Sequence, residues 1–161
     1  MKEIPGSLLG SGLKIAIAFA RFNDLAGERL LSGAREQLLR LGVAEERITL
    51  AKVPGCFELP LAARELAREH DAVIALGVLV RGSTPHFDHI AAECTRGLGE
   101  AALMTGVPVV YGVLTCNTMD EAFDRSGGKM GNKGVEAAAV AVEMARLLRA
   151  LARSESRAVI A

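Results

Sequence analysis

Apolar residues along this chain fall into two kinds of segment, which alternate from residue 14 onward. Four short segments have the length of a strand and carry few polar residues: Lys14–Ala20, Arg47–Val53, Ala72–Val80 and Pro108–Leu114. Between them, apolar residues recur every three or four positions, as in a helix that buries one side. The Ala72–Val80 segment contains no polar residue, which is typical of a strand buried on both faces at the centre of a parallel sheet.

The repeated alternation of strand and helix predicts an α/β fold. Right-handed crossovers would build a central four-stranded parallel sheet with helices on both faces. Capping and breaking residues place the helices. The first expected helix runs from Asn23 or Asp24 to Gly42, and the second starts at the turn Pro54–Glu58 with Pro60 in its first turn. The third runs from Thr84 to Gly106, and the fourth from the capping box at Thr118 to about Arg125. The last follows the glycine-rich segment Gly127–Gly134 and runs from Val135 to about Leu151.

A single domain is predicted for residues 1–161, because no repeat or linker divides the chain. Residues 1–13 are aperiodic and are expected to form an N-terminal arm. Residues 154–161 are expected to be a disordered tail.

Composition suggests association between copies of the chain. Half of the residues are apolar and 4% are aromatic, and the mean hydropathy is +0.28. This value is high for a monomer surrounded by water, so other copies of the chain are expected to cover part of the apolar surface. Lysine plus arginine and aspartate plus glutamate number 19 each, which argues against nucleic acid or an anionic membrane as a partner.

The cysteines indicate the compartment. Cys56, Cys94 and Cys116 are odd in number and form no C-x-x-C pair, which favours reduced thiols in a cytoplasmic protein. The start of the chain superficially resembles a signal peptide, but proline, glycine and charged residues interrupt it, so we expect none. No apolar run reaches the about 18 residues of a membrane-spanning helix.

The stretch GVLVRGSTPHFD, Gly77–Asp88, is the main candidate functional segment. Its apolar half ends the third strand, and Thr84 followed by Pro85 predicts a helix start with a hydroxyl N-cap and proline at the first helical position. Backbone N–H groups at such a helix start bind phosphate or carboxylate. His86, in the same turn, is a candidate acid/base group at the sheet edge where α/β proteins bind ligands.

His86 and the basic residues could also play simpler or different roles. His86 could be a surface residue that starts a helix, or a metal ligand together with His89 and Glu93, which follow at i+3 and i+7. Arg125, with Lys129 and Lys133 around the glycines of the 127–134 segment, could bind a phosphate or could simply complement the dipole at a helix end.

Two further residues near strand ends are ambiguous in the same way. Phe22 could stack on a planar ligand or cover the end of the sheet. Glu58 could accept hydrogen bonds from ligand hydroxyls or could favour a helix N-terminus.

A series of motifs in this chain resembles the 6,7-dimethyl-8-ribityllumazine synthase family: ARFND at 20–24, VPGCFELP at 53–60, GVLVRGSTPHFD at 77–88, TGVPVVYGVLT at 105–115 and RSGGKMGNKG at 125–134. The match runs from about Gly12 to Leu148. It implies a flavodoxin-like three-layer sandwich. It also implies a transferase that condenses 5-amino-6-(D-ribitylamino)uracil with 3,4-dihydroxy-2-butanone 4-phosphate, releasing phosphate and water, in riboflavin biosynthesis. No metal or organic cofactor is implied.

The resemblance implies roles for individual residues. His86 matches the acid/base histidine of the family, and Phe22 matches the aromatic residue that stacks on the pyrimidine. The other residues matched to the pyrimidine and ribityl pocket are Cys56, Phe57, Glu58, Val78, Leu79 and Val80. Those matched to the phosphate site are Ser83, Thr84 and Arg125. Tyr111 and Lys133 match pocket positions that an adjacent subunit supplies, and Arg125 could come from that side as well.

An assembly is implied too. Family members form pentamers with the site between subunits, and GGKMGNKG lacks the insertion associated with pentamer-only members. Without that insertion, the pentamers could assemble further into an icosahedral shell that could enclose riboflavin synthase. This expectation is weaker than that of the pentamer.

Three positions depart from the family pattern. Cys56 stands where alanine is usual, Val78 where a small or hydroxylated residue is frequent, and Tyr111 where phenylalanine is typical. Because the contacts at the first two are expected to be mainly through the backbone, little effect on activity is expected. The Tyr111 hydroxyl needs a partner.

Two classes of function fit the motifs. One is the enzyme, and the other is a non-catalytic lumazine- or flavin-binding protein or shell. The joint presence of His86, Arg125 and Lys133 favours the enzyme, because a binding protein needs no imidazole beside the phosphate.

Overall fold

The computed structural model describes residues 1 and 3–158, with side chains described as far as residue 154. A four-stranded parallel sheet lies at its centre, in the order β2-β1-β3-β4. The strands are β1 (Ile15–Ala20), β2 (Ile48–Val53), β3 (Ala72–Val80) and β4 (Val109–Cys116). All four strands were predicted from the apolar pattern, with ends that differ by at most two residues.

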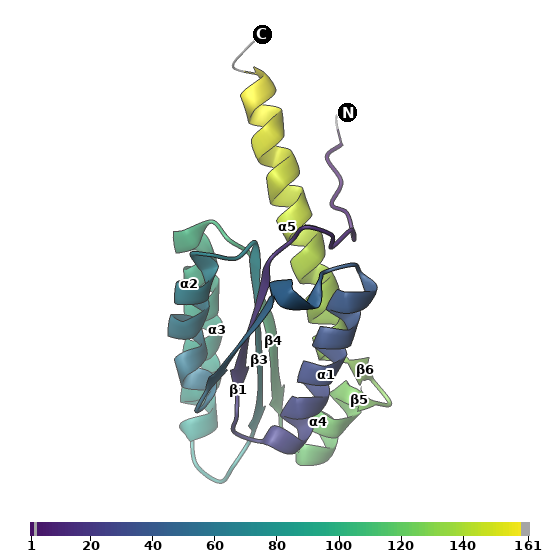
Figure 1. The fold of residues 1–161 in the computed structure, drawn as a ribbon. Helices are drawn as coiled ribbons and strands as arrows, with labels where there is room; N and C mark the ends of the chain where they lie inside the picture. The colour runs from purple at the N-terminus through teal and green to yellow at the C-terminus, as the bar shows by residue number, and fades with distance from the viewer. Residues whose placement is uncertain (2, 159–161) are drawn as a thin grey trace.

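Helices cover both faces of this sheet (Figure 1). The helices α1 (Asp24–Arg40) and α5 (Lys133–Ala158) lie on one face, and α2 (Leu59–Ala67) and α3 (His86–Thr105) lie on the other. Short elements complete the chain: η1 (Glu45–Arg47), η2 (Cys56–Glu58), α4 (Met119–Arg125) and a hairpin of β5 (Ser126–Gly128) and β6 (Gly131–Asn132). This is the flavodoxin-like three-layer sandwich that was predicted.

The alternation of side chains along β1 explains the two unequal layers. Ile15, Ile17 and Phe19 face the core under α1 and α5. The intervening alanines, 16, 18 and 20, face α2 and α3. Large side chains fill one layer and small ones let the other pair of helices approach closely, because successive residues of a strand point to opposite faces.

Several predicted boundaries were wrong. The α3 helix begins at His86 with Pro85 as its N-cap, and no side chain caps it, so Thr84 is not the N-cap. The Pro85 carbonyl accepts the first helical bonds, from the N–H groups of Asp88 at 3.1 Å and His89 at 3.4 Å. A proline ring disfavours helical backbone in the residue before it, which keeps Thr84 outside the helix.

The last helix is longer than predicted at both ends. It starts at Lys133, and part of the glycine-rich connection forms the β5–β6 hairpin. It continues to Ala158, into the stretch 154–161 that was expected to be a disordered tail, and residues 159–161 lie outside the described part of the chain. Because no glycine or proline follows Arg153, nothing in the sequence breaks the helix there.

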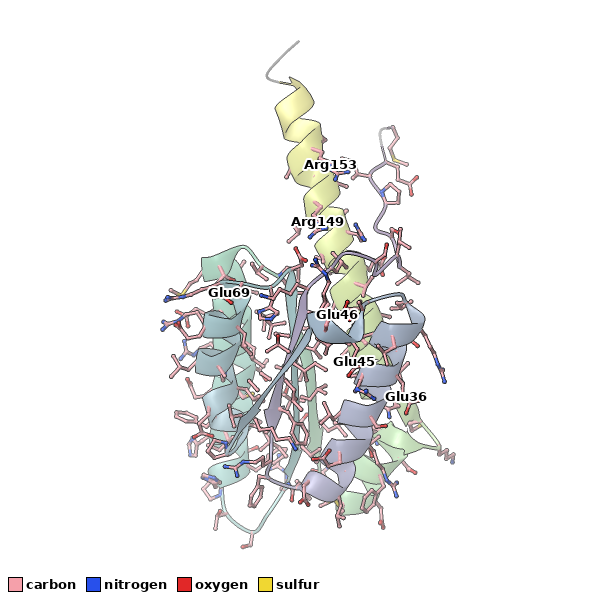
Figure 2. All side chains as sticks on the ribbon, in the orientation of Figure 1. Glu36, Glu45, Glu46, Glu69, Arg149 and Arg153 are labelled. Atoms are coloured by element: carbon pink, nitrogen blue, oxygen red, sulfur yellow. The ribbon has the colours of Figure 1, made fainter. Side chains whose placement is uncertain are left out.

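The projecting half of α5 is attached at the amino edge of the sheet (Figure 2). Arg149 of α5 donates from Nη2 to Oδ1 of Asp71 at 2.5 Å. Oδ2 of Asp71 accepts the backbone N–H of Lys14 at 2.8 Å. The N-terminal arm lies on the same helix, since Arg146 donates to the carbonyls of Leu9 and Ser11. The carboxyl edge of the sheet, at the opposite end, is left open.

Candidate active site

A cavity of about 550 Å³ opens at the carboxyl edge of the sheet. It lies between the turn after β1, the η2 turn and the start of α3. Its lining combines aromatic rings, a carboxylate, an imidazole and exposed backbone. The predicted site residues that line it are Phe22, Cys56, Phe57, Glu58, Leu79, Val80, Thr84 and His86.

Phe22 stands in the turn between β1 and α1 with 68% of its surface exposed. It therefore does not cover the sheet end as a buried residue would. The next residue, Asn23, adopts the left-handed conformation, with φ 61° and ψ 45°. Its Nδ2 donates to the carbonyl of Val78 at 2.9 Å, which ties this turn to the end of β3. The bond fixes the position from which the Phe22 ring projects.

The η2 turn contributes the second wall. Oε2 of Glu58 accepts the backbone N–H of Gly55 at 2.9 Å, so the carboxylate closes its own turn. Phe57 is 58% exposed, whereas Cys56 is buried. Burial raises the pKa of the Cys56 thiol to about 12, so the thiol is neutral at physiological pH and is no nucleophile there.

The loop from β3 to α3 forms the third wall. Residues 82–86 are exposed, and His86 is the first residue of α3. The N-terminal N–H groups of a twenty-residue helix face this region, and they carry the positive end of the helix dipole. An anion bound here would lie close to the His86 imidazole.

Tyr111, Arg125 and Lys133 are not in this cavity. They line a separate cavity of about 670 Å³ between the edge strand β4 and α5. Arg125 donates from Nη1 to the Glu121 carbonyl at 3.0 Å, and Lys133 pairs with Glu136 at 2.7 Å. Within one chain, the predicted site residues therefore form two groups on different sides of β4.

The hydroxyl of Tyr111 has a partner in the same chain. It lies 3.2 Å from Oγ1 of Thr95 on α3. Since Thr95 donates its single hydroxyl proton to the Ala91 carbonyl at 2.8 Å, Tyr111 is the donor in this pair. The raised pKa of the Tyr111 phenol, caused mainly by burial, keeps that proton in place.

Two predicted residues do not line either cavity with their side chains. Val78 is fully buried in the core, and its carbonyl is engaged by Asn23. Ser83 is exposed on the loop. The sequence pattern indicated Asn23 only as a helix cap. The signal that could have identified its role is an asparagine in the short turn between a strand and a helix, since asparagine tolerates the left-handed conformation in turns.

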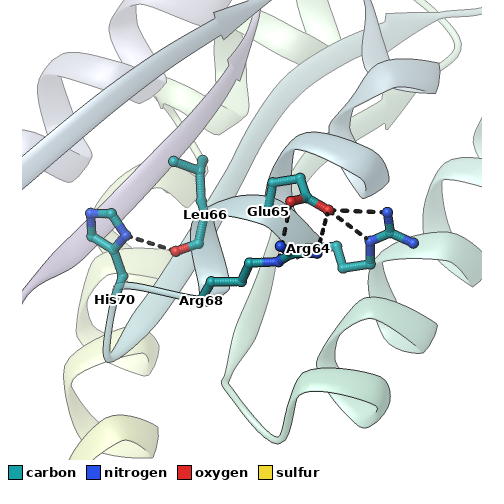
Figure 3. Close-up of polar contacts among 5 residues, drawn as sticks. All are labelled: Arg64, Glu65, Leu66, Arg68 and His70. Carbon is teal, nitrogen blue, oxygen red and sulfur yellow. Dashed lines mark hydrogen bonds and ion pairs between the residues drawn. The ribbon is translucent and has the colours of Figure 1, made fainter.

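The remaining histidines provide no competing site. His70 lies at the opposite edge of the sheet, where Nδ1 contacts the Leu66 carbonyl at 2.7 Å (Figure 3). Its Nε2 contacts Oγ1 of Thr49 at 2.8 Å. Beside it, Arg64 and Arg68 pair with Glu65. The described residues contain no group of three or more metal-binding side chains, and Glu93 pairs with Arg96 at 2.6 Å.

These features define an α/β protein of flavodoxin-like topology, with a candidate ligand site at the carboxyl edge that offers an aromatic face, a carboxylate and the N-terminal end of a helix. Comparison with known proteins is more specific. The chain belongs to the 6,7-dimethyl-8-ribityllumazine synthase family, whose model matches residues 12–149.

Two relatives carry the same name. The 6,7-dimethyl-8-ribityllumazine synthase of Anaeromyxobacter dehalogenans (strain 2CP-C) is 49% identical, and that of Anaeromyxobacter sp. (strain K) is 48% identical. Each alignment covers 98% of this chain and 98% of the relative. Among the described residues, no helix is long and apolar enough to span a membrane.

Proposed function

We propose that this protein condenses 5-amino-6-(D-ribitylamino)uracil with 3,4-dihydroxy-2-butanone 4-phosphate to 6,7-dimethyl-8-ribityllumazine, releasing phosphate and water, as a transferase of riboflavin biosynthesis. Membership of the family supports this reaction. The main structural support for this function is that Phe22, Glu58 and His86, from three distant parts of the sequence, line one cavity at the carboxyl edge.

The pyrimidine substrate fits the side of the cavity formed by the turn after β1 and by η2. The exposed ring of Phe22 offers a face on which a planar heterocycle stacks. Glu58 keeps Oε1 for a ribityl hydroxyl while Oε2 holds Gly55. The backbone at Cys56 and Phe57 and at Leu79 and Val80 completes this part of the pocket.

The phosphorylated substrate fits the other side, at the start of α3. Ser83, Thr84 and the helix N-terminus would hold its phosphate. His86 is then placed to move protons as the 5-amino group forms an imine with the ketone, as phosphate leaves and as the second amine closes the ring. Protein side chains and backbone suffice for these steps, so we propose no metal or organic cofactor.

A second copy of the chain would complete the site. Arg125, Lys133 and Tyr111 line the cavity beside the edge strand β4, and that face carries exposed apolar side chains such as Val140 and Met144. We propose that they meet the first cavity of an adjacent subunit, with Arg125 on the phosphate. Repetition of this contact would give a ring of five subunits, and such rings could assemble further into an icosahedral shell. Light scattering would measure the mass of the assembly.

Two further aspects belong to the same proposal. The three cysteines are free and buried, which fits a reducing compartment, so we place the enzyme in the cytoplasm. If a shell forms, riboflavin synthase is the expected enclosed partner, and co-purification of the two proteins tests this.

The direct experiment is to incubate the purified protein with both substrates and to follow the absorbance of the lumazine. Turnover supports the enzyme. Tight binding of the product without turnover would instead favour a lumazine-binding protein. Activity that survives exhaustive chelation would eliminate the alternative in which His86, His89 and Glu93 bind a catalytic metal.

A further inference from the structure

An ion pair closes the loop between β3 and α3. Arg81 directly follows β3, and Asp88 lies in the first turn of α3. Nη2 of Arg81 donates to Oδ1 of Asp88 at 2.8 Å, and Nη1 donates to Oδ2 at 3.0 Å. Because both contacts form at once, the guanidinium fixes the orientation of the carboxylate as well as its distance.

Arg81 is itself held from several directions. Its backbone N–H donates to the carbonyl of Cys116 at 2.9 Å, which extends the pairing of β3 with β4. Its Nε donates to Oδ1 of Asn117 at 3.2 Å. Its Cζ lies 4.3 Å from the centre of the Phe87 ring, within the range of a cation–π contact. Arg81 therefore joins the end of β4 to the first turn of α3.

The loop that this pair spans has little packing of its own. Residues 82–86 are exposed. At Gly82, an added Cβ would meet no atom within 4 Å. In the described part of the chain, the bidentate contact is therefore the main side-chain constraint on the shape of this loop.

We propose that Arg81 and Asp88 are positioning residues. They hold the loop at 82–85 and the start of α3 so that the N–H groups there and His86 face the phosphate of the substrate, while Arg81 and Asp88 do not touch the substrate. The inference rests on the proposed function, because the phosphate site is assigned there. Since Asp88 balances the charge of Arg81, the pair supplies no net charge to the phosphate. That charge comes from the helix end and from Arg125.

The alternative is that Arg81 leaves Asp88 and binds the phosphate directly. The two roles of Arg81 predict opposite effects of Asp88→Asn on phosphate binding. If Arg81 is a ligand, freeing it from its carboxylate leaves phosphate binding unchanged or stronger. If the pair positions the loop, the same substitution weakens phosphate binding, because the loop loses its constraint.

The experiment compares Asp88→Asn, Arg81→Lys and the double variant with the wild-type protein. Glu45→Gln is the matched control. Glu45 accepts from Nε and Nη2 of Arg35 at 2.9 and 2.8 Å (Figure 2 labels Glu45). Its side chain is 54% exposed, close to the 57% of Asp88. The measurements are kcat, KM for each substrate, titration with inorganic phosphate, the thermal midpoint and the oligomer mass.

We expect each single variant to raise the KM of the phosphorylated substrate and the Kd of inorganic phosphate by about threefold to fivefold, as for loss of an exposed bidentate ion pair. The double variant should bind phosphate no more weakly than the single variant with the lower phosphate affinity, because both substitutions remove the same interaction. The pyrimidine KM, the thermal midpoint and the oligomer mass should not change, since an exposed pair contributes little to stability.

Several results would overturn the inference. They are unchanged or tighter phosphate binding by Asp88→Asn, equal losses for both substrates, additive effects in the double variant, or an effect of Glu45→Gln as large as that of Asp88→Asn. If the wild-type protein binds phosphate without turnover, the proposed function fails while the phosphate titration still tests the pair. If it does neither, both fail.

Discussion

Asn23 and Val78 join two turns of the site through one hydrogen bond, from Nδ2 of the asparagine to the carbonyl of the valine at 2.9 Å. The two residues are 55 positions apart in the sequence. Asn23 is also the one non-glycine residue with positive φ among those that the structure describes. The side-chain hydrogen bond of Asn23 therefore stabilises a backbone conformation that most residues avoid, next to the exposed ring of Phe22.

Substitution of Asn23 should separate the hydrogen bond from the backbone strain. Asn23→Ala loses the bond and keeps the unfavourable φ, so we expect a loss of about 1–3 kcal/mol in the free energy of unfolding. Asn23→Gly loses the same bond without strain and should be less destabilised. Urea unfolding measures both. Equal losses in the two variants would show that the left-handed conformation carries no cost here.

Phe22→Ala should reduce substrate binding without reducing stability. The ring is 68% exposed, so its removal leaves no cavity. Loss of stacking should raise the KM of the pyrimidine substrate by about fivefold to tenfold, the equivalent of about 1 kcal/mol. Leu25→Ala is a matched control, because Leu25 is 73% exposed and does not line the cavity. A similar KM for Phe22→Ala and the wild-type protein would refute the stacking role.

His86→Ala should chiefly lower kcat. An acid/base group contributes about 10²–10⁴-fold in general, and we expect a loss at or below this range because the uncatalysed condensation is feasible. His89→Ala, an exposed histidine one turn further along α3, serves as the control. Both variants should unfold at the wild-type temperature. A kcat for His86→Ala within about twofold of wild type would rule out the acid/base role.

The long apolar strands could be predicted because burial on both faces leaves a local signal, as the unbroken run of β3 shows. The β5–β6 hairpin could not. It depends on Asn132, whose Nδ2 donates to the carbonyl of Arg29 at 2.9 Å, 103 residues away. The far end of α5 was missed for another reason. Residues 153–157, RSESR, are all polar, so no apolar period marks the helix there.

The site was predictable in part for the same reasons. Strand ends gather at one edge of a parallel sheet, so Phe22, Glu58 and His86 could be expected together. The separation of Tyr111, Arg125 and Lys133 into another cavity followed only from the family resemblance. Local pattern does not say which side of an edge strand faces a neighbouring copy. The special role of Asn23 in its turn could have been suspected from the asparagine there, but its partner Val78, 55 positions away, could not be predicted because the contact depends on tertiary structure.

The buried thiols should make stability depend on alkaline pH. Burial raises the pKa of Cys56 from 9.0 to about 12 and that of Cys94 to about 11. Between about pH 9 and these values the native thiols keep protons that the unfolded chain releases, so unfolding is favoured as pH rises. Each thiol should contribute a slope of up to about 1.4 kcal/mol per pH unit.

Cys56→Ala tests this assignment. Urea unfolding between about pH 8 and 11 should show a shallower loss of stability in the variant than in the wild-type protein. Native thiols should also react slowly with iodoacetamide at about pH 8, since little thiolate is present. Identical pH slopes in the two proteins would indicate that Cys56 titrates normally in the folded state.

Gly77 of β3 and Cys56 should show coupled effects on packing. A Cβ added at Gly77 would lie 2.6 Å from Sγ of Cys56, 3.2 Å from Cβ of Ala20 and 3.4 Å from Cδ1 of Leu59. Gly77→Ala should therefore lower the free energy of unfolding by about 1–3 kcal/mol, the usual cost of overpacking. Cys56→Ala in the same chain removes the closest atom and should restore most of this loss, since the two other contacts need only small shifts. Thermal midpoints of both single variants and the double variant, at equal protomer concentration, measure the coupling. Strictly additive losses would mean that the sulfur is not what Gly77 must avoid.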